Sequence, residues 1–329
     1  MRTITIILSL FLAATHTLAQ PHNQASVQAS DSTYSYDRRR FSVDTSQFAD
    51  TVPLLWSGQK AYLPVIVNGQ KFLFLLDTGA GMSILYKEAM RRRSHSLTDA
   101  LAPAGRIKML DALGQEATVD VVLAERVVVG NNDSCPSRLT LSNYPLCLMS
   151  RPAGTVHCDG VLGFDFINKG LLAKIDTRQA QLIVSDQPKL FANESGYTLK
   201  YKLQHHVPYL QLWPFAHMDE LMAFDTGCSY MCLLNNKHFA DYERLRPNEV
   251  AAQTYDSNSS QVLIGTLSAD TTHTPTHLRL HSLRWQRYSI NDVTAQTTRW
   301  SSRVGAPILE HHALVIDGRR RRIVLQPYK

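Results

Sequence analysis

The stretch "LLDTGAGMSIL", residues 75–85, places an aspartate at the end of an apolar segment. Two leucines precede Asp77, and small or apolar residues follow the Asp-Thr-Gly that it begins. A lone ionised carboxylate in apolar surroundings costs several kcal/mol unless it is paired or protonated. Ordinary turn chemistry is one explanation, because Asp, Thr and Gly are common in turns that follow strands. The rest of the chain must decide between a turn and a site.

The same pattern returns in the second half of the chain, in "AFDTGCSYMCLL" at residues 223–234. Each copy follows a Tyr-Leu segment and is completed farther on by a glycine-containing block, "VLGFDF" at 161–166 or "VGAPIL" at 304–309. The separation between motif and block is nearly equal in the two halves, which indicates an internal repeat. We therefore expect two homologous lobes, over residues 51–187 and 188–329.

Short apolar runs typical of β-strands fill most of the chain after residue 51. Asn68-Gly69 separates two of these runs and predicts a tight hairpin. A Val-rich run followed by a turn is expected at 117–132, and another strand pair at 173–184. Helices are expected to be short and few, with residues 84–93 the best candidate. The pattern predicts a mainly β protein.

Two repeated carboxylates suggest a chemistry that a single one does not. If Asp77 and Asp225 face each other across a pseudo-twofold axis, they can share one proton, which removes the cost of burying two charges. The ionised carboxylate then takes a proton from a bound water as the water attacks a peptide carbonyl, and the protonated one donates to the carbonyl oxygen. Gly79 and Gly227 permit the close approach that this requires. No metal or cofactor is needed.

The doubled motif, with its completing blocks, resembles the retropepsin-like aspartic proteases, and two such lobes in one chain resemble pepsin-type enzymes. The resemblance covers about residues 52–327. It implies a bilobal acid-protease fold of two β-barrel-like lobes with the active-site cleft between them. It also implies an endopeptidase in which Asp77 and Asp225 are catalytic, with Thr78 and Thr226 as a supporting grip across the axis.

A β-hairpin flap over the cleft is a further implication of the resemblance. The segment 109–122, with Leu113 and Gly114 near its middle, is the expected flap of lobe 1. The segment 262–270, around Gly265, occupies the equivalent part of lobe 2. These residues are the expected contacts to a peptide or protein substrate.

The residue after each Asp-Thr-Gly departs from the pepsin pattern, which usually has Ser or Thr there. Ala80 and Cys228 occupy these positions. Losing the hydroxyl that stabilises an ionised aspartate raises the pKa values of the pair. We therefore expect a less acidic pH optimum than that of pepsin, and a profile that peaks below about pH 3 would contradict this.

The overall composition excludes few classes of function. The chain has 329 residues, of which 44% are hydrophobic and 19% charged, with a formal net charge of +6. Its basic clumps, at 91–93 and 319–322, have the character of solvated faces, and no nucleic-acid-binding signature accompanies them. One chain carrying both halves of the pair predicts a monomer with pseudo-twofold symmetry.

The N-terminal residues 1–19 have the three parts of a secretory signal peptide, with cleavage expected near Ala19. No second long apolar run follows, so no membrane span is expected, and the mature protein is expected to be secreted or periplasmic. Residues 20–50 are polar and read as a linker or leader. A propeptide over 20–48 that covers the cleft is an open alternative.

The cysteine positions do not determine which residues form disulfide bonds. The mature chain would carry five, an odd number, and a bridge among the first three is plausible in an oxidising compartment. They are Cys135, Cys147, Cys158, Cys228 and Cys232. No finger-like spacing favours a metal site.

Three other functions compete with a protease. A metal hydrolase is disfavoured because the pairs His205-His206 and His311-His312 are sequence neighbours, whose side chains point to opposite faces in a strand. Serine-based acyl transfer lacks a G-x-S-x-G motif. A non-catalytic peptide-binding protein on the same fold is the strongest alternative, because fold alone does not establish activity.

Overall fold

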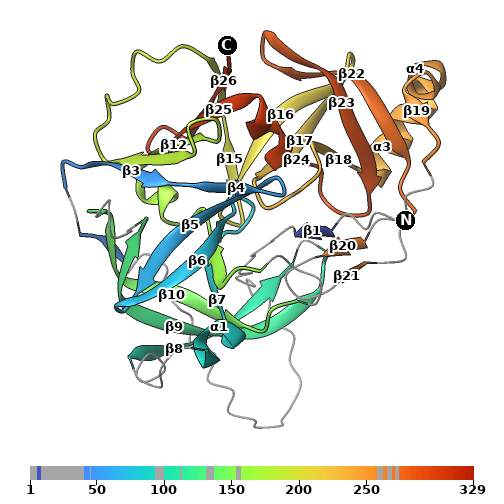
Figure 1. The fold of residues 1–329 in the computed structure, drawn as a ribbon. Coiled ribbons are helices and arrows are strands. Elements are labelled where there is room, and N and C mark those ends of the chain that lie inside the picture. The colour runs from blue at the N-terminus through green and yellow to red at the C-terminus, as the bar shows by residue number, and fades with distance from the viewer. Residues whose placement is uncertain are drawn as a thin grey trace, which may run out of the picture.

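The computed structural model describes residues 6–8, 41–44, 46–92, 100–111, 113–130, 137–152, 157–257, 262–264, 269–270 and 274–329 (Figure 1). The elements of the first half are β1 (Ile6–Leu8), β2 (Ser42–Val43), β3 (Ala49–Pro53), β4 (Leu55–Ser57), β5 (Lys60–Val67), β6 (Gln70–Leu76), β7 (Ser83–Tyr86), α1 (Lys87–Arg91), β8 (Leu101–Leu110), β9 (Glu116–Val129), β10 (Thr140–Met149), β11 (Gly160–Leu162), η2 (Ile167–Lys169), β12 (Leu172–Asp176) and β13 (Gln181–Ser185). Those of the second half are β14 (Tyr197–Lys200), β15 (Lys202–Gln204), β16 (Val207–Phe215), β17 (Met218–Asp225), β18 (Cys232–Asn235), α3 (Asn236–Leu245), α4 (Pro247–Ala251), β19 (Thr254–Tyr255), β20 (Val262–Ile264), β21 (Ala269–Asp270), β22 (His277–Trp285), β23 (Tyr288–Thr298), β24 (Arg303–Gly305), η3 (Ala306–Glu310), β25 (His312–Asp317) and β26 (Arg322–Pro327).

Three large sheets form the body of the protein. A nine-stranded sheet, in the order β2-β10-β7-β11-β6-β5-β9-β8 with β4 beside β5, belongs to the first half. An eight-stranded sheet, β15-β16-β17-β24-β18-β23-β22-β19, belongs to the second. Figure 1 shows them on opposite sides of the molecule. We call strands β2–β13 lobe 1 and β14–β26 lobe 2. The predicted mainly β, bilobal architecture is confirmed.

The third sheet joins the lobes. Its order is β14-β26-β25-β12-β13-β3, so each lobe supplies three strands, and β12 pairs with β25 across the junction. The predicted division at residues 187 and 188 falls in the connection between β13 and β14. A separate small sheet contains β1, β20 and β21. Most of the predicted signal peptide and leader lies outside the described residues.

The repeat is visible in strand register. In lobe 1, β5 and β6 form the hairpin predicted at Asn68-Gly69, whose φ angles of 45° and 82° suit a tight turn that follows the twist of the strands. In each lobe the strand leading to Asp-Thr-Gly then pairs in parallel with the strand of the completing block. Leu76 pairs with Leu162 in lobe 1, and Asp225 pairs with Gly305 in lobe 2. Both motifs therefore end at equivalent places.

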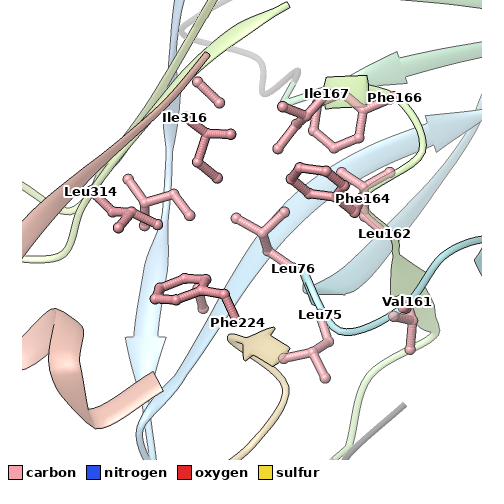
Figure 2. Packing of buried hydrophobic residues seen from close by; sticks show 14 of the residues in the cluster. Leu75, Leu76, Val161, Leu162, Phe164, Phe166, Ile167, Phe224, Leu314 and Ile316 are labelled. Carbon is pink, nitrogen blue, oxygen red and sulfur yellow. The ribbon is translucent and has the colours of Figure 1, made fainter. Parts of the chain in front are cut away.

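One apolar core continues beneath both motifs. Leu75, Leu76 and Phe164 of lobe 1 and Phe224 and Leu314 of lobe 2 are fully buried members of it. Figure 2 shows these side chains gathered from both lobes around the segments that lead to the aspartates. Since close-packed interiors resist displacement, this core fixes the two motif loops relative to each other.

The helices differ in part from expectation. Within the predicted helix 84–93, residues up to Tyr86 continue β7, and α1 covers only Lys87–Arg91. The longer helix α3 was not predicted. Its signal is Asn235, whose side chain accepts hydrogen bonds from the first helical N–H groups and caps the helix.

Among the residues that the structure describes, no helix is long and apolar enough to cross a membrane.

Candidate active site

The two Asp-Thr-Gly loops meet at their threonines. The N–H of Thr78 donates to Oγ1 of Thr226 over 3.0 Å, and the N–H of Thr226 donates to Oγ1 of Thr78 over 3.1 Å. Each hydroxyl also donates to the carbonyl that precedes the opposite aspartate, Thr78 to Phe224 at 2.7 Å and Thr226 to Leu76 at 2.9 Å. All four hydrogen bonds are buried, so they are shielded from water and strengthened by the low local dielectric.

The glycines of the motifs lie against the opposite carboxyl groups. A Cβ on Gly79 would lie 2.5 Å from Cγ of Asp225, and one on Gly227 would collide with Oδ2 of Asp77. Neither glycine has a positive φ, so what the site requires here is space and not backbone freedom. The N–H of Gly79 donates to Oδ1 of Asp77 at 2.7 Å. The loops thus bring Asp77 and Asp225 together.

Burial sets the proton affinity of Asp77. The residue is 0% exposed and Asp225 is 1% exposed. Burial is the largest cause that raises the pKa of Asp77 well above its ordinary value, and the charge of Asp225 and a hydrogen bond with its side chain add to it. Lys60 and the N–H of Gly79 act in the opposite direction. A proton is therefore retained at this pair above the range of a free carboxyl.

Two buried basic side chains adjoin the pair, which corrects the expectation of apolar surroundings. Arg303 in β24 forms an ion pair with Asp225, with 3.2 Å between Nη1 and Oδ2, and the two side chains are 2% and 1% exposed. Lys60, the first residue of β5, donates from Nζ to the carbonyl of Gly227. Burial lowers the pKa of Lys60, and coulombic interactions with Cys228, Asp225 and Asp77 oppose this effect.

Sequence reasoning missed both cations, although each has a signal. Arg303 stands two residues before Gly305, where lobe 1 has an apolar Val161 at the corresponding place before Gly163. Lys60 begins an otherwise apolar strand. A charged residue in a strand otherwise expected to be fully buried indicates a paired or functional charge.

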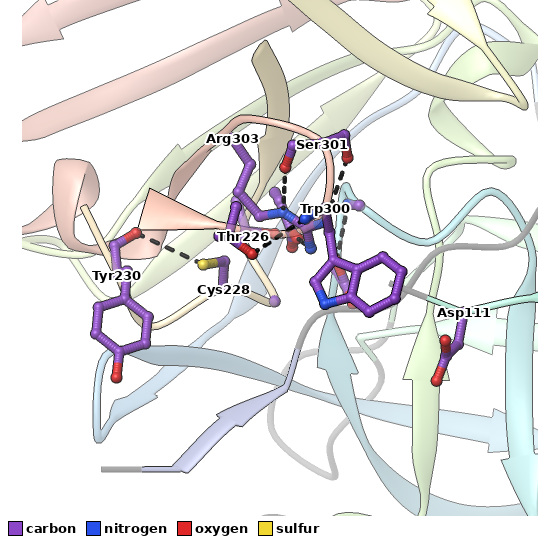
Figure 3. A network of polar contacts seen from close by, with 12 residues as sticks. Asp111, Thr226, Cys228, Tyr230, Trp300, Ser301 and Arg303 are labelled. Carbon is purple, nitrogen blue, oxygen red and sulfur yellow. Dashed lines mark hydrogen bonds and ion pairs between the residues drawn. The ribbon is translucent and has the colours of Figure 1, made fainter. Parts of the chain in front are cut away.

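The residues after the two motifs supply no hydroxyl group. Ala80 is fully buried, and its backbone bonds to Asp77 and Phe164 within lobe 1. The thiol of Cys228 lies 3.6 Å from the carbonyl of Tyr230, toward which it donates (Figure 3). Burial, with the nearby charge of Asp225, raises the pKa of Cys228 to about 11, so this thiol is neutral near pH 7. Neither position reproduces the Ser or Thr of pepsin-type enzymes.

The bridge considered from the sequence among Cys135, Cys147 and Cys158 involves a residue outside the described part of the chain. Cys158, Cys228 and Cys232 are buried free thiols, and Cys147 is also buried. Cys135 lies outside the described residues. Among the described residues, no three His, Cys, Asp or Glu side chains are grouped so that they could hold a metal ion.

Strands β8 and β9 form a long hairpin at the predicted flap of lobe 1. Asp111 organises its tip, because its Oδ1 accepts from the N–H groups of Leu113 and Gln115, each at 2.8 Å. Gly114 has a φ of +69°, a conformation that glycine adopts without strain. The described residues Leu113–Gln115 are therefore held in place beside Asp111.

This tip lies against lobe 2. Leu113 is 4% exposed and packs in a small apolar cluster with Cys228 and Leu233, with Trp300 beside them. A Cβ on Gly114 would collide with the indole ring of Trp300. Figure 3 shows Trp300 close to Arg303. The hairpin thus spans from lobe 1 to the neighbourhood of Asp225. Gly265, the predicted flap residue of lobe 2, lies outside the described residues.

Comparisons with known proteins agree with this geometry. Residues 63–166, which include the first Asp-Thr-Gly and its completing block, match a family model described as aspartyl protease. No curated protein sequence matches the chain. The solved structure of an aspartic proteinase from Irpex lacteus matches with a TM-score of 0.52 and 14% identity, over 86% of this chain and 98% of that one. The resemblance to aspartic proteases is thereby confirmed, and the fold is the bilobal acid-protease fold.

Proposed function

We propose that this protein is an aspartic endopeptidase whose Asp77 and Asp225 activate a water molecule for peptide hydrolysis. One observation carries the proposal: the reciprocal threonine bonds and the crowded glycines hold two buried carboxyl groups against each other. A buried pair of carboxyl groups has no evident structural benefit, since burying ionisable groups is costly. Retention of one proton at the pair gives it both an acid and a base.

The reaction follows from the shared proton. The ionised carboxylate accepts a proton from water while the water oxygen bonds to the peptide carbonyl carbon, and the protonated carboxyl donates to the carbonyl oxygen. The resulting tetrahedral species loses its C–N bond as a proton passes to the nitrogen. Peptide carboxyl and amine groups are released, and the pair regains its single proton. The lobe 1 hairpin supplies a cover that excludes water from this step.

Peptide cleavage by the wild type and by Asp77→Asn and Asp225→Asn tests the proposal. A peptide library is incubated between about pH 3 and pH 8, with and without a pepstatin-type inhibitor. We expect cleavage by the wild type and a loss of at least about a hundredfold in both variants, since each removes one half of the acid–base pair. Asp176→Asn, a buried aspartate in β12, is the matched control and retains activity. Equal cleavage by all variants contradicts the role of the pair.

A non-catalytic peptide-binding protein is the second candidate, and one observation favours it. The guanidinium of Arg303 forms a buried ion pair with Asp225, so a side chain already compensates the charge of this carboxylate. If no peptide is cleaved at any pH, binding of the same library to the immobilised protein decides for this alternative. Binding without cleavage supports it, and absence of both contradicts it.

Export and oligomeric state are part of the proposal. The sequence of residues 1–19 supports export to the periplasm or the outside of the cell, with cleavage near Ala19. N-terminal sequencing of the protein recovered from each cell fraction tests this, and also shows whether residues 20–48 are removed on activation. Because one chain supplies both aspartates, we propose a monomer, which light scattering after gel filtration checks.

A further inference from the structure

The ion pair between Arg303 and Asp225 makes the two aspartates unequal. Its atoms Nη1 and Oδ2 are 3.2 Å apart, and both side chains are almost completely buried. Arginine does not give up its proton in proteins, so this positive charge persists at every pH at which the fold survives. A fixed buried cation favours the ionised form of the carboxyl group that it contacts. Asp77 has instead the N–H of Gly79 as a partner, a neutral donor.

The pseudo-symmetry of the fold shows that this cation belongs to one lobe only. In lobe 2, Arg303 pairs with Ala223, two residues before Asp225. In lobe 1, Leu75 lies two residues before Asp77. Its partner in the paired strand is Val161, which is 0% exposed. The same register thus places a guanidinium beside one aspartate and an isopropyl group at the matching place near the other.

Other titratable groups face the pair and must be included in its charge balance. They are Lys60 of β5, Tyr86 of β7, Tyr209 of β16 and Cys228 of the second motif. Burial raises the pKa of both tyrosines and of the thiol, so these three are neutral near pH 7. The amine of Lys60 interacts with both carboxyl groups and donates a hydrogen bond to the carbonyl of Gly227.

We propose that Arg303 is a positioning residue that keeps Asp225 ionised and leaves the proton of the pair on Asp77. The catalytic consequence rests on the proposed function: Asp225 accepts the proton of the attacking water, and Asp77 donates to the peptide carbonyl oxygen. Arg303 touches no reacting atom in this scheme. It acts by deciding which of two chemically identical side chains is the base and which is the acid.

Carboxyl NMR of the full chain, labelled with ¹³C at the aspartate side chains, tests the assignment without any substrate. The two resonances are identified by their loss in Asp77→Asn and Asp225→Asn. We expect Asp225 to ionise at lower pH than Asp77 in the wild type. In Arg303→Met the midpoint of Asp225 rises by roughly one pH unit or more, while Arg303→Lys retains most of the difference. Val161→Ala alters packing at the equivalent position of lobe 1 without removing a charge, and it leaves the titration midpoints of both aspartates unchanged.

Two outcomes overturn the proposal. One is ionisation of Asp77 before Asp225 in the wild type, which needs no variant to fold. The other is an unchanged midpoint of Asp225 in a folded Arg303→Met protein. The pH profile of kcat/KM adds a second readout, because the acidic limb moves to higher pH in Arg303→Met and not in Val161→Ala. Absence of cleavage by the wild type contradicts the proposed function alone and leaves the NMR result standing.

Discussion

Thr78 and Thr226 exchange hydrogen bonds in both directions, each N–H donating to the hydroxyl of the other over 3.0 and 3.1 Å. Each hydroxyl then donates to a carbonyl of the opposite loop. Four bonds therefore tie the lobes at the point where the aspartates meet.

Replacing either threonine by valine should cost stability as well as activity. Thr78→Val keeps the shape of the side chain but leaves the N–H of Thr226 and the carbonyl of Phe224 buried without these partners. We expect a loss of about 1–3 kcal/mol for each unsatisfied group in chemical denaturation. Thr78→Ser keeps the hydroxyl and is the control. If valine and serine variants unfold at the same denaturant concentration, the bonds contribute nothing measurable.

The motif glycines are expected to tolerate no side chain. In Gly79→Ala the new Cβ would lie 2.5 Å from Cγ of Asp225, so the carboxyl group must move. Overpacking of this kind costs about 1–3 kcal/mol, and displacement of the aspartate should abolish cleavage. Gly58→Asn is the control, because Gly58 lies in an open turn with no atom within 4 Å of its Cβ position. This variant should leave both stability and activity unchanged. Full activity of Gly79→Ala would contradict the close approach of the carboxyl groups.

Serine at the positions after the motifs should move the pH profile of the activity to lower pH. Ala80→Ser and Cys228→Ser each add a hydroxyl donor near an aspartate that now has none at that position, which stabilises the ionised form. We expect the acidic limb of the kcat/KM profile to move to lower pH in Cys228→Ser, beside the base Asp225, and the alkaline limb to move to lower pH in Ala80→Ser, beside the acid Asp77. Ala173→Ser, at a fully buried site in β12, introduces the same group elsewhere. A shift to higher pH, or the same shift in the control, contradicts the explanation.

Burial of Asp77 should appear in the pH dependence of stability. Its pKa is higher in the folded protein than its ordinary value of 3.8, so the folded state binds more protons than the unfolded one above that pH. Stability contributed by this group is therefore complete below about pH 3.8 and is lost as pH rises toward the folded pKa. We expect the Tm of Asp77→Asn to gain on that of the wild type between about pH 4 and pH 7. A constant difference would contradict a raised pKa.

The contact of the lobe 1 hairpin with Trp300 should slow the opening of its tip. In Trp300→Ala the ring that lies against Gly114 is lost, and with it part of the cluster around Leu113. We expect faster hydrogen exchange at the N–H groups of Leu113 and Gln115 and, if the hairpin covers substrate, a higher KM. Trp213→Ala, where the ring packs against Arg284 in lobe 2, is the control. Unchanged exchange at the tip would show that the contact is not stabilising.

The sequence alone determined the repeated elements of this protein. Asn68-Gly69 specified a hairpin because both residues accept positive φ, and the short apolar runs specified a mainly β protein. The two Asp-Thr-Gly motifs and their glycine blocks identified the pair of loops. These are local signals, carried by residues within a few positions of one another. The helix α3 was missed because its short capping signal at Asn235 competes with a weakly apolar segment.

Only the tertiary structure decided what surrounds the two aspartates. Lys60 comes from the other lobe than the glycine carbonyl that it binds, and Arg303 is far along the chain from Asp225. Trp300 reaches Gly114 in the same way, across the gap between lobes. Such contacts depend on how sheets pack and on which strand pairs with which, and no local pattern encodes them. The sequence identified two carboxyl groups in equivalent motifs. The folded chain places Arg303 beside Asp225 only, so the two carboxyl groups have different electrostatic surroundings.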